Sequence, residues 1–209
     1  MNTLTDLSPL FEYDKTVRLF HPVFCGIDEA GRGPLAGDVY AAAVILEDGV
    51  VIEGLNDSKK LTEKKREELF DEIVSNAKSF CIATASVEEI EHLNILQAAL
   101  LAMKRAVEGL DIAPEYALVD GNKFPPISIE GETVVKGDGT SASIAAASIL
   151  AKVSRDRYMK KAAEKYPDWQ FERHKGYGTK LHYEMLDKYG PSPIHRMSFL
   201  KKYYAAKQE

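Results

Sequence analysis

The sequence predicts an α/β or α+β fold, built on a five-stranded mixed sheet with helices on its faces. Two observations predict this class. Five short apolar stretches are rich in β-branched, aromatic or small residues, and most of them end at aspartate or glycine, as strands commonly do. Longer stretches between and after them show helix caps, or apolar residues at spacings of three and four.

Composition and turn residues locate the strands. An apolar run at 23–28 ends in carboxylates, and the run at 39–46 enters a turn at Glu47-Asp48-Gly49. The stretch 79–87 mixes small, aromatic and β-branched residues, which favours a strand. The last two runs are each closed by aspartate beside glycine. The predicted strands are 23–28, 39–46, 79–87, 116–120 and 132–136.

Caps and periodicity locate the helices. Thr62 precedes an acidic first turn and suits an N-cap. Farther along, Ile90, Leu93 and Leu96 follow helical spacing. The alanine- and serine-rich first half of 140–166 would let that helix pack closely against a sheet. The predicted helices are 63–75, 87–110, 140–166, 179–188 and 193–206.

The N-terminal segment, residues 1–20, shows no strong pattern, but Phe11, Tyr13 and Phe20 predict that it packs onto the body. It lacks the basic and then apolar pattern of a signal peptide. No apolar run reaches the ~18 residues that would span a bilayer. We therefore expect a cytoplasmic protein with no membrane partner.

The totals predict one domain with a sizeable core, because the 209 residues are 45% hydrophobic and 28% charged. Cys25 and Cys81 lie in apolar runs and are expected to be reduced, buried thiols. The net charge of −5 is unevenly distributed. Residues 151–209 hold 14 Lys or Arg against 7 Asp or Glu, whereas residues 1–150 hold 13 against 25. This asymmetry fits an acidic, metal-collecting half beside a basic half that could hold a polyanion.

The stretch from Phe24 to Gly37 organises the chain. Its apolar run ends in Asp28 and Glu29, and a glycine-rich turn with one arginine follows at once. Neighbouring side chains of a strand point to opposite faces, so Asp28 and Glu29 can approach one centre only near a strand end, where the chain begins to turn. The glycines leave backbone groups open to a ligand.

Two other interpretations of this stretch are weaker. A solvated acidic turn after a core strand is the usual explanation for a single Asp-Glu pair. The pattern Gly31-x-Gly33-x-x-Ala36 matches a dinucleotide fingerprint, which requires a helix to follow. The residues at 39–46 instead favour a strand, and the preceding carboxylates would repel a pyrophosphate.

Carboxylates follow three of the predicted strands. Asp28 and Glu29 end the first, Asp120 ends the fourth and Asp138 follows the fifth. Parallel strands present their C-terminal ends at one edge of an α/β sheet, so these groups are expected to meet there. An all-oxygen set suits Mg²⁺ or Mn²⁺. Two such ions ~3.5–4 Å apart can promote phosphodiester cleavage.

Six segments resemble, in order, the signature blocks of bacterial ribonuclease HII, a type 2 ribonuclease H family. These blocks are 26–37, 57–61, 118–122, 136–138, 145–156 and 174–179. The resemblance implies a ribonuclease H-like fold with a C-terminal helical extension. It divides the chain into an N-terminal segment (1–19), a catalytic core (20–166) and an extension of the same domain (167–209).

The resemblance also implies an activity. The chain would hydrolyse the RNA strand of RNA–DNA hybrids and would cut on the 5′ side of ribonucleotides embedded in duplex DNA, leaving 3′-hydroxyl and 5′-phosphate ends. Asp28, Glu29, Asp120 and Asp138 would be catalytic residues that bind Mn²⁺ or Mg²⁺, with two ions in the substrate complex. The partners would be these nucleic acids, and the protein would act as a monomer.

Further residues are carried over from the resemblance as substrate contacts. The turn Gly31-Arg32-Gly33 would sense the ribose 2′-hydroxyl, which separates RNA from DNA, largely through backbone groups. Tyr177 would stack on the sugar next to the scissile phosphate. Ser58, Lys59 and Lys152 are candidate phosphate contacts, with solvated surface as the alternative.

Three polar residues near these blocks receive no catalytic role. Asp156 lies in a predicted helix beside two arginines and is expected to form ion pairs. His174 and His195 have no second histidine or cysteine at metal-binding spacing, so no role is assigned to them.

Two functions of other classes remain open on the sequence. The same fold could hold hybrids without cleaving them, although four closely placed carboxylates argue against that. It could also belong to another two-metal nuclease or a resolvase, because a fold alone does not fix the substrate.

Overall fold

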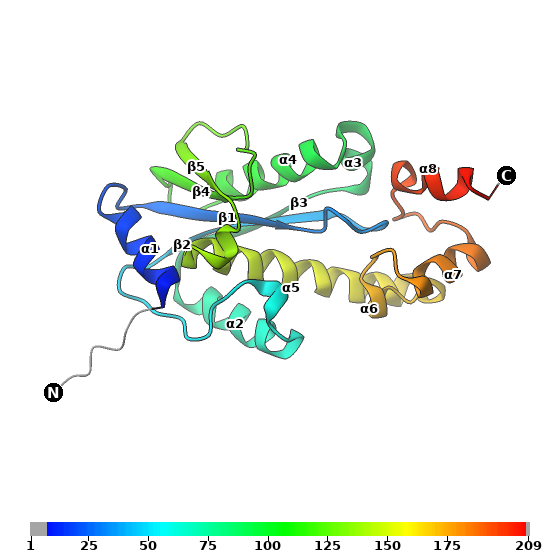
Figure 1. The fold of residues 1–209 in the computed structure, drawn as a ribbon, viewed down its shortest axis with the longest axis horizontal. Coiled ribbons are helices and arrows are strands. Elements are labelled where there is room, and N and C mark those ends of the chain that lie inside the picture. The colour runs from blue at the N-terminus through cyan, green and yellow to red at the C-terminus, as the bar shows by residue number, and fades with distance from the viewer. Residues whose placement is uncertain (1–7, 208–209) are drawn as a thin grey trace.

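The computed structural model describes residues 8–207 and contains the predicted mixed sheet (Figure 1). The strand order is β3-β2-β1-β4-β5. The first three strands in the chain pair antiparallel, whereas β1, β4 and β5 run parallel. The strands are β1 (Phe24–Ala30), β2 (Val39–Leu46), β3 (Ala77–Ala85), β4 (Tyr116–Asp120) and β5 (Glu130–Val134).

Helices and short 3-10 turns precede, connect and follow these strands within the described part of the chain. The α-helices are α1 (Pro9–Arg18), α2 (Glu63–Asn76), α3 (Val87–Leu93), α4 (Ile95–Glu108), α5 (Ala142–Lys165), α6 (Phe171–His174), α7 (Lys180–Tyr189) and α8 (Met197–Ala205). The 3-10 turns are η1 (Ser58–Lys60), η2 (Gly137–Gly139) and η3 (Pro167–Trp169). Figure 1 shows the helices after α5 beyond one end of the sheet, as the predicted C-terminal extension.

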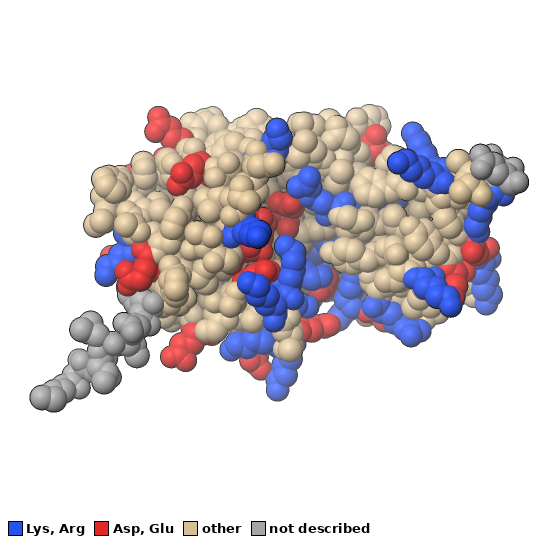
Figure 2. Space-filling model, in the orientation of Figure 1, with Lys and Arg blue, Asp and Glu red and all other residues tan. Residues whose placement is uncertain are grey.

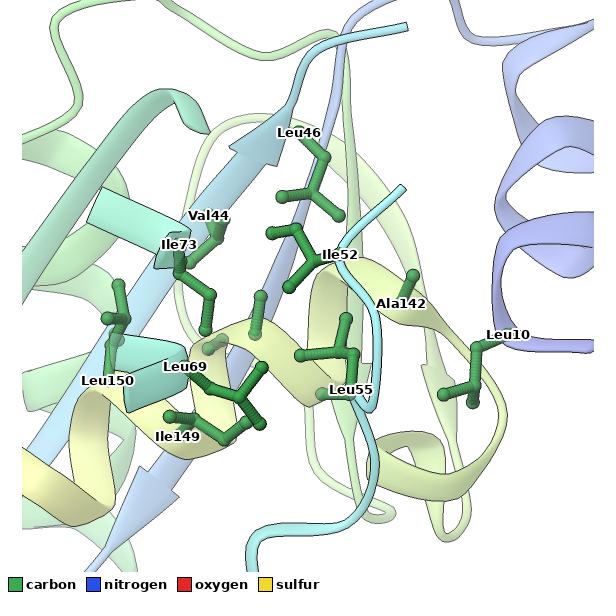
Figure 3. Close-up of a cluster of buried hydrophobic side chains, with 14 of the residues drawn as sticks. Leu10, Val44, Leu46, Ile52, Leu55, Leu69, Ile73, Ala142, Ile149 and Leu150 are labelled. Atoms are coloured by element: carbon green, nitrogen blue, oxygen red, sulfur yellow. The ribbon is translucent and has the colours of Figure 1, made fainter. Parts of the chain in front are cut away.

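The sheet is covered on both faces (Figure 1): α3 and α4 lie on one face, and α2 and α5 lie on the other. Side chains of β2 alternate between the two cores, as strand geometry requires. Val44 and Leu46 belong to the cluster with α5, and Ala43 and Ile45 belong to the cluster with α4. Figure 3 shows the first cluster, where leucines and isoleucines of α2 and α5 meet the strand.

The predicted close packing of the alanine-rich helix is confirmed. A Cβ atom at Gly26 of β1 would lie 2.2 Å from the carbonyl carbon of Ser143, so the helix backbone touches the strand. The small residues in the first half of α5 are fully buried: Ala142, Ala145, Ala146, Ala147 and Ala151. This contact brings the α5 residues that follow, including Ser148, under the end of β1.

The single helix predicted at 87–110 is wrong, because the chain breaks at Asn94 into α3 and α4. Asn94 has a left-handed φ of 69°, and its side-chain oxygen accepts hydrogen bonds from the N–H groups of Leu96 and Gln97. This local cap begins a second helix without disturbing the apolar periodicity. The cap at Thr62 was predicted, and its hydroxyl does accept from the N–H of Lys65.

The fifth strand lies two residues earlier than predicted. It spans Glu130–Val134, and Lys136 has a left-handed φ of 57°. Asp138 therefore does not end a strand. It lies in η2, the tight turn that leads from the sheet into α5.

The N-terminal segment contains a helix, α1, that the pattern did not predict. Phe11 is buried against the core as expected, but Phe20 is 79% exposed, so its predicted packing role is wrong. Cys25 is a buried free thiol, whereas Cys81 is only half-buried. Within residues 8–207, no helix combines the length and apolar character needed to cross a bilayer.

A carboxylate of α1 caps the central helix. Asp14 is buried and accepts hydrogen bonds from the Ser141 hydroxyl (2.6 Å) and from the backbone N–H and hydroxyl of Ser143 (2.8 and 2.6 Å). A helix N-terminus leaves N–H groups unpaired and favours negative charge. Asp14 thus joins the N-terminal segment to the start of α5.

Asp14→Ala is expected to lower the free energy of unfolding by about 2–4 kcal/mol, because three buried donors lose their acceptor. Urea denaturation followed by circular dichroism measures the change. Asp71→Ala on the exposed side of α2 is the control and should change stability by less than about 0.5 kcal/mol. Equal effects of the two substitutions would show that the buried cap is unimportant.

A chain of neutral histidines fills the interior of the extension. The N–H of Ser192 donates to Nδ1 of His195 (2.8 Å), so the proton of that ring lies on Nε2. Nε2 of His195 lies 2.9 Å from Nε2 of His182, whose Nδ1 donates to the carbonyl of Tyr177 (2.9 Å). His174 stacks on His182 with ring centroids 4.1 Å apart. The imidazoles therefore support the loop that carries Tyr177.

Burial lowers the pKa of His182 to about 4 and that of His195 to about 3. The unfolded chain binds these protons near pH 6.5, so the stability of the extension is complete above that pH and falls as the pH drops toward these values. Relative to pH 7.5, we expect each of the two rings to contribute a loss of roughly 2 kcal/mol at pH 5. His195→Gln should flatten this pH dependence in thermal melts, whereas His92→Gln on exposed α3 should leave it unchanged. If the wild type, His195→Gln and His92→Gln showed the same dependence of melting temperature on pH, the assignment of His182 and His195 as buried neutral rings would be contradicted.

Candidate active site

Two carboxylates project from the last residues of β1. Pairing of β1 with β4 ends at Ile27, but its pairing with β2 continues to Ala30. The strand therefore runs through Asp28 and Glu29, and the turn expected at these residues begins only afterwards. Asp28 is 4% exposed, and one of its oxygens accepts a hydrogen bond from the N–H of Glu29 (2.7 Å).

The other two predicted carboxylates reach the same end of the sheet from neighbouring elements. Asp120 is the last residue of β4, and its Oδ1 accepts a hydrogen bond from the N–H of Gly137 (2.7 Å). Asp138 follows Gly137, and its Oδ2 atom lies 3.6 Å from Nζ of Lys59. Parallel pairing of β1 with β4, together with the η2 turn, thus gathers acids from three separate parts of the sequence.

The electrostatics show how closely these groups interact. Burial raises the pKa of Asp28 well above its usual value, and the charges of Glu29 and Asp120 raise it further. Burial also raises the pKa of Glu29, although Arg32 opposes the shift. The pKa of Asp138 is raised by burial and by the charges of nearby carboxylates, Asp120 among them. Burial and mutual repulsion therefore disfavour full ionisation of the carboxylates at this rim.

The carboxylates fit a divalent cation by the chemistry of their donors. An all-oxygen set at a partly buried rim is what Mg²⁺ and Mn²⁺ prefer. Within residues 8–207, no group of three or more Asp, Glu, His or Cys side chains is already arranged so that it could hold a metal ion. Lys59 instead reaches into the acids, and their charges raise its pKa against the effect of partial burial. A flexible ammonium group thus supplies positive charge at the rim.

A groove of about 210 Å³ lies beside the acids and is lined by most of the predicted site residues. Its lining is Asp28, Glu29, Ala30, Gly31, Arg32, Gly33, Ser58, Lys59, Ser148, Lys152 and Tyr177. Asp120 does not line it but contributes with Glu29 and Arg32 to a smaller pocket of about 50 Å³ against α4. Figure 2 shows acidic side chains near the middle of this face, with Lys and Arg side chains gathered around them.

The predicted phosphate contacts differ in how accessible they are. Lys59 has an exposed side chain, but Ser58 is buried and its hydroxyl is paired with that of Ser148 (2.8 Å). Lys152 forms an ion pair with Asp156 (2.7 Å). Asp156 therefore does form ion pairs, but with Lys152 and, at 3.9 Å, with Arg66 instead of its flanking arginines.

Tyr177 lies at the outer edge of the groove, where its ring is available to a ligand. It is 41% exposed. The Lys152 ammonium and the Arg155 guanidinium lie 5.7 and 5.8 Å from the ring centroid. A partly exposed aromatic ring with two cations nearby suits the sugar–phosphate chain of a nucleic acid.

The two glycines of the turn are required for different reasons. Gly31 has a φ of +103°, and a Cβ there would lie 2.2 Å from Nε of Arg155, so the fold itself requires glycine. A Cβ at Gly33 would meet only a ring carbon of Tyr177, at 4.0 Å. The fold does not require glycine at that position, and the absence of a side chain leaves the backbone of Gly33 open at the groove.

Sequence reasoning missed three residues that shape this site. Ser148 lines the groove floor, while Arg155 and Arg196 are fully buried beneath the turn. Ser148 and Arg155 lie within the block 145–156, so their segment was noted but their contacts were not. Arg196 gave no signal, because a buried arginine and a surface arginine look alike in a sequence.

Known proteins are similar to this chain in both sequence and fold. Residues 25–202 match the family model described as Ribonuclease HII. The chain is 56% identical over 177 residues to a Ribonuclease HII of Caldicellulosiruptor bescii, covering 85% of this chain and 86% of the relative.

Solved structures agree with the fold. Ribonuclease H2 from Pyrococcus horikoshii matches with a TM-score of 0.70 and 26% identity, covering 84% of this chain and 92% of that one. Bst-RNase HIII in complex with Mn²⁺ shares the fold with a TM-score of 0.69 at 15% identity, over 95% of this chain and 73% of the other. From the family match and the relatives at this level of identity, we conclude that the chain belongs to the ribonuclease HII family.

Proposed function

We propose that this member of the ribonuclease HII family acts at the groove beside the four carboxylates. It hydrolyses the RNA strand of RNA–DNA hybrids and nicks duplex DNA on the 5′ side of an embedded ribonucleotide, leaving 3′-hydroxyl and 5′-phosphate ends. The observation that carries the proposal is the lining of one groove by nine predicted site residues, next to Asp120 and Asp138.

The reaction depends on divalent metal, and we propose that Asp28, Glu29, Asp120 and Asp138 hold it. The raised pKa values of Asp28, Glu29 and Asp138 support this role, because a cation would relieve the repulsion that burial intensifies. Mn²⁺ or Mg²⁺ fits the oxygen donors, and two ions in the substrate complex would stabilise charge on the attacking and leaving oxygens. A protein of the same fold, Bst-RNase HIII, is described in complex with Mn²⁺.

The remaining residues of the groove would position the substrate. Glu29 or Asp138 would orient the attacking water, so no protein nucleophile is needed. Tyr177 would stack on the sugar beside the scissile phosphate. Lys59, whose side chain is 79% exposed, has the freedom to leave the acids and contact a phosphate. Such contacts hold the duplex without reading its bases.

The organisation of the chain follows from the same proposal. Residues 20–166 would form the catalytic core, residues 1–19 an N-terminal segment, and residues 167–209 an extension that contacts the duplex. The basic excess of residues 151–209 supports contact with a polyanion. The protein would act as a cytoplasmic monomer.

One assay separates this activity from its rivals. The purified chain is incubated with Mn²⁺ or Mg²⁺ and a DNA duplex that contains a single ribonucleotide, with an all-DNA duplex in parallel. A nick 5′ to the ribose supports the proposal. Binding without cleavage would favour a hybrid-binding protein, and cutting of plain DNA would favour another nuclease or a resolvase.

Asp120→Asn is expected to lower the nicking rate about 100-fold or more, because a metal ligand contributes several kcal/mol to transition-state stabilisation. Hybrid binding, measured by fluorescence anisotropy in EDTA, should stay within about threefold, since phosphate contacts dominate affinity. Asp111→Asn, on the exposed loop before β4, is the control. Near-wild-type turnover of Asp120→Asn would reject the assignment.

Gly33→Ala is expected to fold normally and to cut poorly. Its new methyl group meets no backbone, so the free energy of unfolding should change by less than about 0.5 kcal/mol. The methyl group would project into the groove, and we expect nicking at a single ribonucleotide to fall about 10-fold or more. Gly31→Ala should instead destabilise the fold. Full activity in Gly33→Ala would mean that no substrate group approaches this backbone.

A further inference from the structure

Arg196 lies beneath the glycine-rich turn and holds most of its carbonyl groups. The side chain is 0% exposed. Its guanidinium donates to the backbone oxygens of Gly31 (2.7 Å), Arg32 (3.1 Å), Pro34 (2.8 Å) and Gly37 (2.6 and 2.9 Å). This residue directly precedes α8, so the support comes from the extension, more than 150 positions away in the sequence.

Arg155 of α5 completes the support from the other side. It donates to the carbonyls of Ala36 (3.0 Å), Asp38 (3.2 Å) and Lys175 (3.1 Å). No carboxylate lies within salt-bridge distance of Arg155 or Arg196 in residues 8–207, so backbone carbonyl dipoles are their main partners. Burying two cations without a carboxylate partner costs free energy, which indicates that the segment they hold must keep a defined conformation.

These bonds set the direction of the exposed peptide groups. In a trans peptide, the C=O of one residue and the N–H of the next point in opposite directions. Because the carbonyls of Gly31 and Arg32 point at Arg196, the N–H groups of Arg32 and Gly33 point away from it. Within residues 8–207, neither of these N–H groups donates a hydrogen bond, and the carbonyl of Gly33 accepts none. The turn thus presents two donors and one acceptor beside the groove.

We propose that Arg196 is the positioning residue that fixes this set of backbone groups for recognition of a ribose 2′-hydroxyl. The hydroxyl both donates and accepts, so two N–H groups and one C=O match its chemistry. The inference rests on the proposed function and deepens it, since it assigns recognition of ribose to a contact between the core and the extension. Arg196 itself does not touch the substrate.

Further backbone contacts hold the same segment to the extension. The N–H of Leu35 donates to the carbonyl of Gly176, that of Gly37 donates to Ile194, and that of Arg196 donates back to Leu35, each at 2.8 Å. Removing the Arg196 guanidinium should therefore leave the extension docked. What is lost is the orientation of the peptides at 31–33.

Arg196→Lys tests the proposal, because lysine keeps the charge but lacks the planar fork that reaches several carbonyls at once. Affinity is measured by anisotropy in EDTA for a duplex with one ribonucleotide and for the all-DNA duplex. The wild-type protein should prefer the ribonucleotide duplex, and the variant should lose most of that preference. Its kcat for nicking should fall about 10-fold or more while KM stays within about threefold, since phosphate contacts remain.

Glu91→Ala is the matched control. Glu91 accepts hydrogen bonds from the backbone and hydroxyl of Ser198 at the start of α8 (2.7–3.1 Å), so its removal loosens the extension without touching the turn. This variant should keep the preference for ribonucleotide duplex. An unchanged preference in Arg196→Lys, or an equal loss in Glu91→Ala, would overturn the positioning role.

A measurement on the wild-type chain covers the case in which Arg196→Lys fails to fold. The backbone ¹⁵N order parameters of Arg32 and Gly33 should match the sheet, about 0.85, because the guanidinium immobilises their peptides. Values below about 0.6 would show a mobile turn and would overturn the proposal. Failure of the wild-type protein to nick a ribonucleotide duplex would instead reject the proposed function, so the two failures are distinguishable.

Discussion

The structure depends on repulsion among four carboxylates, which its own cations relieve only in part. Asp28, Glu29, Asp120 and Asp138 reach one rim from β1, β4 and η2, and burial strengthens the interactions among their charges. Lys59 and Arg32 offset part of that charge from exposed positions. A divalent cation would relieve the repulsion that remains, which supports the metal-dependent hydrolysis that we propose for this rim.

The architecture explains how this crowding is maintained. The parallel pairing of β1 with β4 places Asp28 next to Asp120, and the close contact of α5 with Gly26 sets the helix beneath both. Asp14 fixes the start of α5 from the N-terminal side. A short turn, η2, then brings Asp138 to the same place. The site therefore depends on the whole core, including α1, the helix that carries Asp14.

The glycine-rich turn is held in place by a different set of contacts. It follows β1 directly, yet its carbonyls are held by Arg155 and by Arg196 of the extension. The extension in turn packs around neutral histidines that support the Tyr177 loop. In this account, the core supplies the charge for cleavage and the extension supplies the geometry that recognises ribose. Both meet in one groove.

Local patterns predicted much of this organisation. The strand pattern located β1 and β2, the alanine-rich run predicted the close packing of α5, and the carboxylates were expected at one edge. Features that arise from side-chain caps or distant contacts were not visible. Asn94 breaks a helix without altering its periodicity, and Lys136 ends β5 early through its left-handed backbone. Arg196 acquires its partners only when residues far apart in the sequence meet.

Mn²⁺ located by its anomalous scattering in crystals of this protein would show whether the four carboxylates share divalent metal. We expect an anomalous peak bounded by oxygens of Asp28, Glu29, Asp120 and Asp138. We also expect Lys59 to move away from Asp138 when the ion binds. Mn²⁺ bound elsewhere, with the rim empty at saturating metal, would show that these carboxylates do not form the metal site.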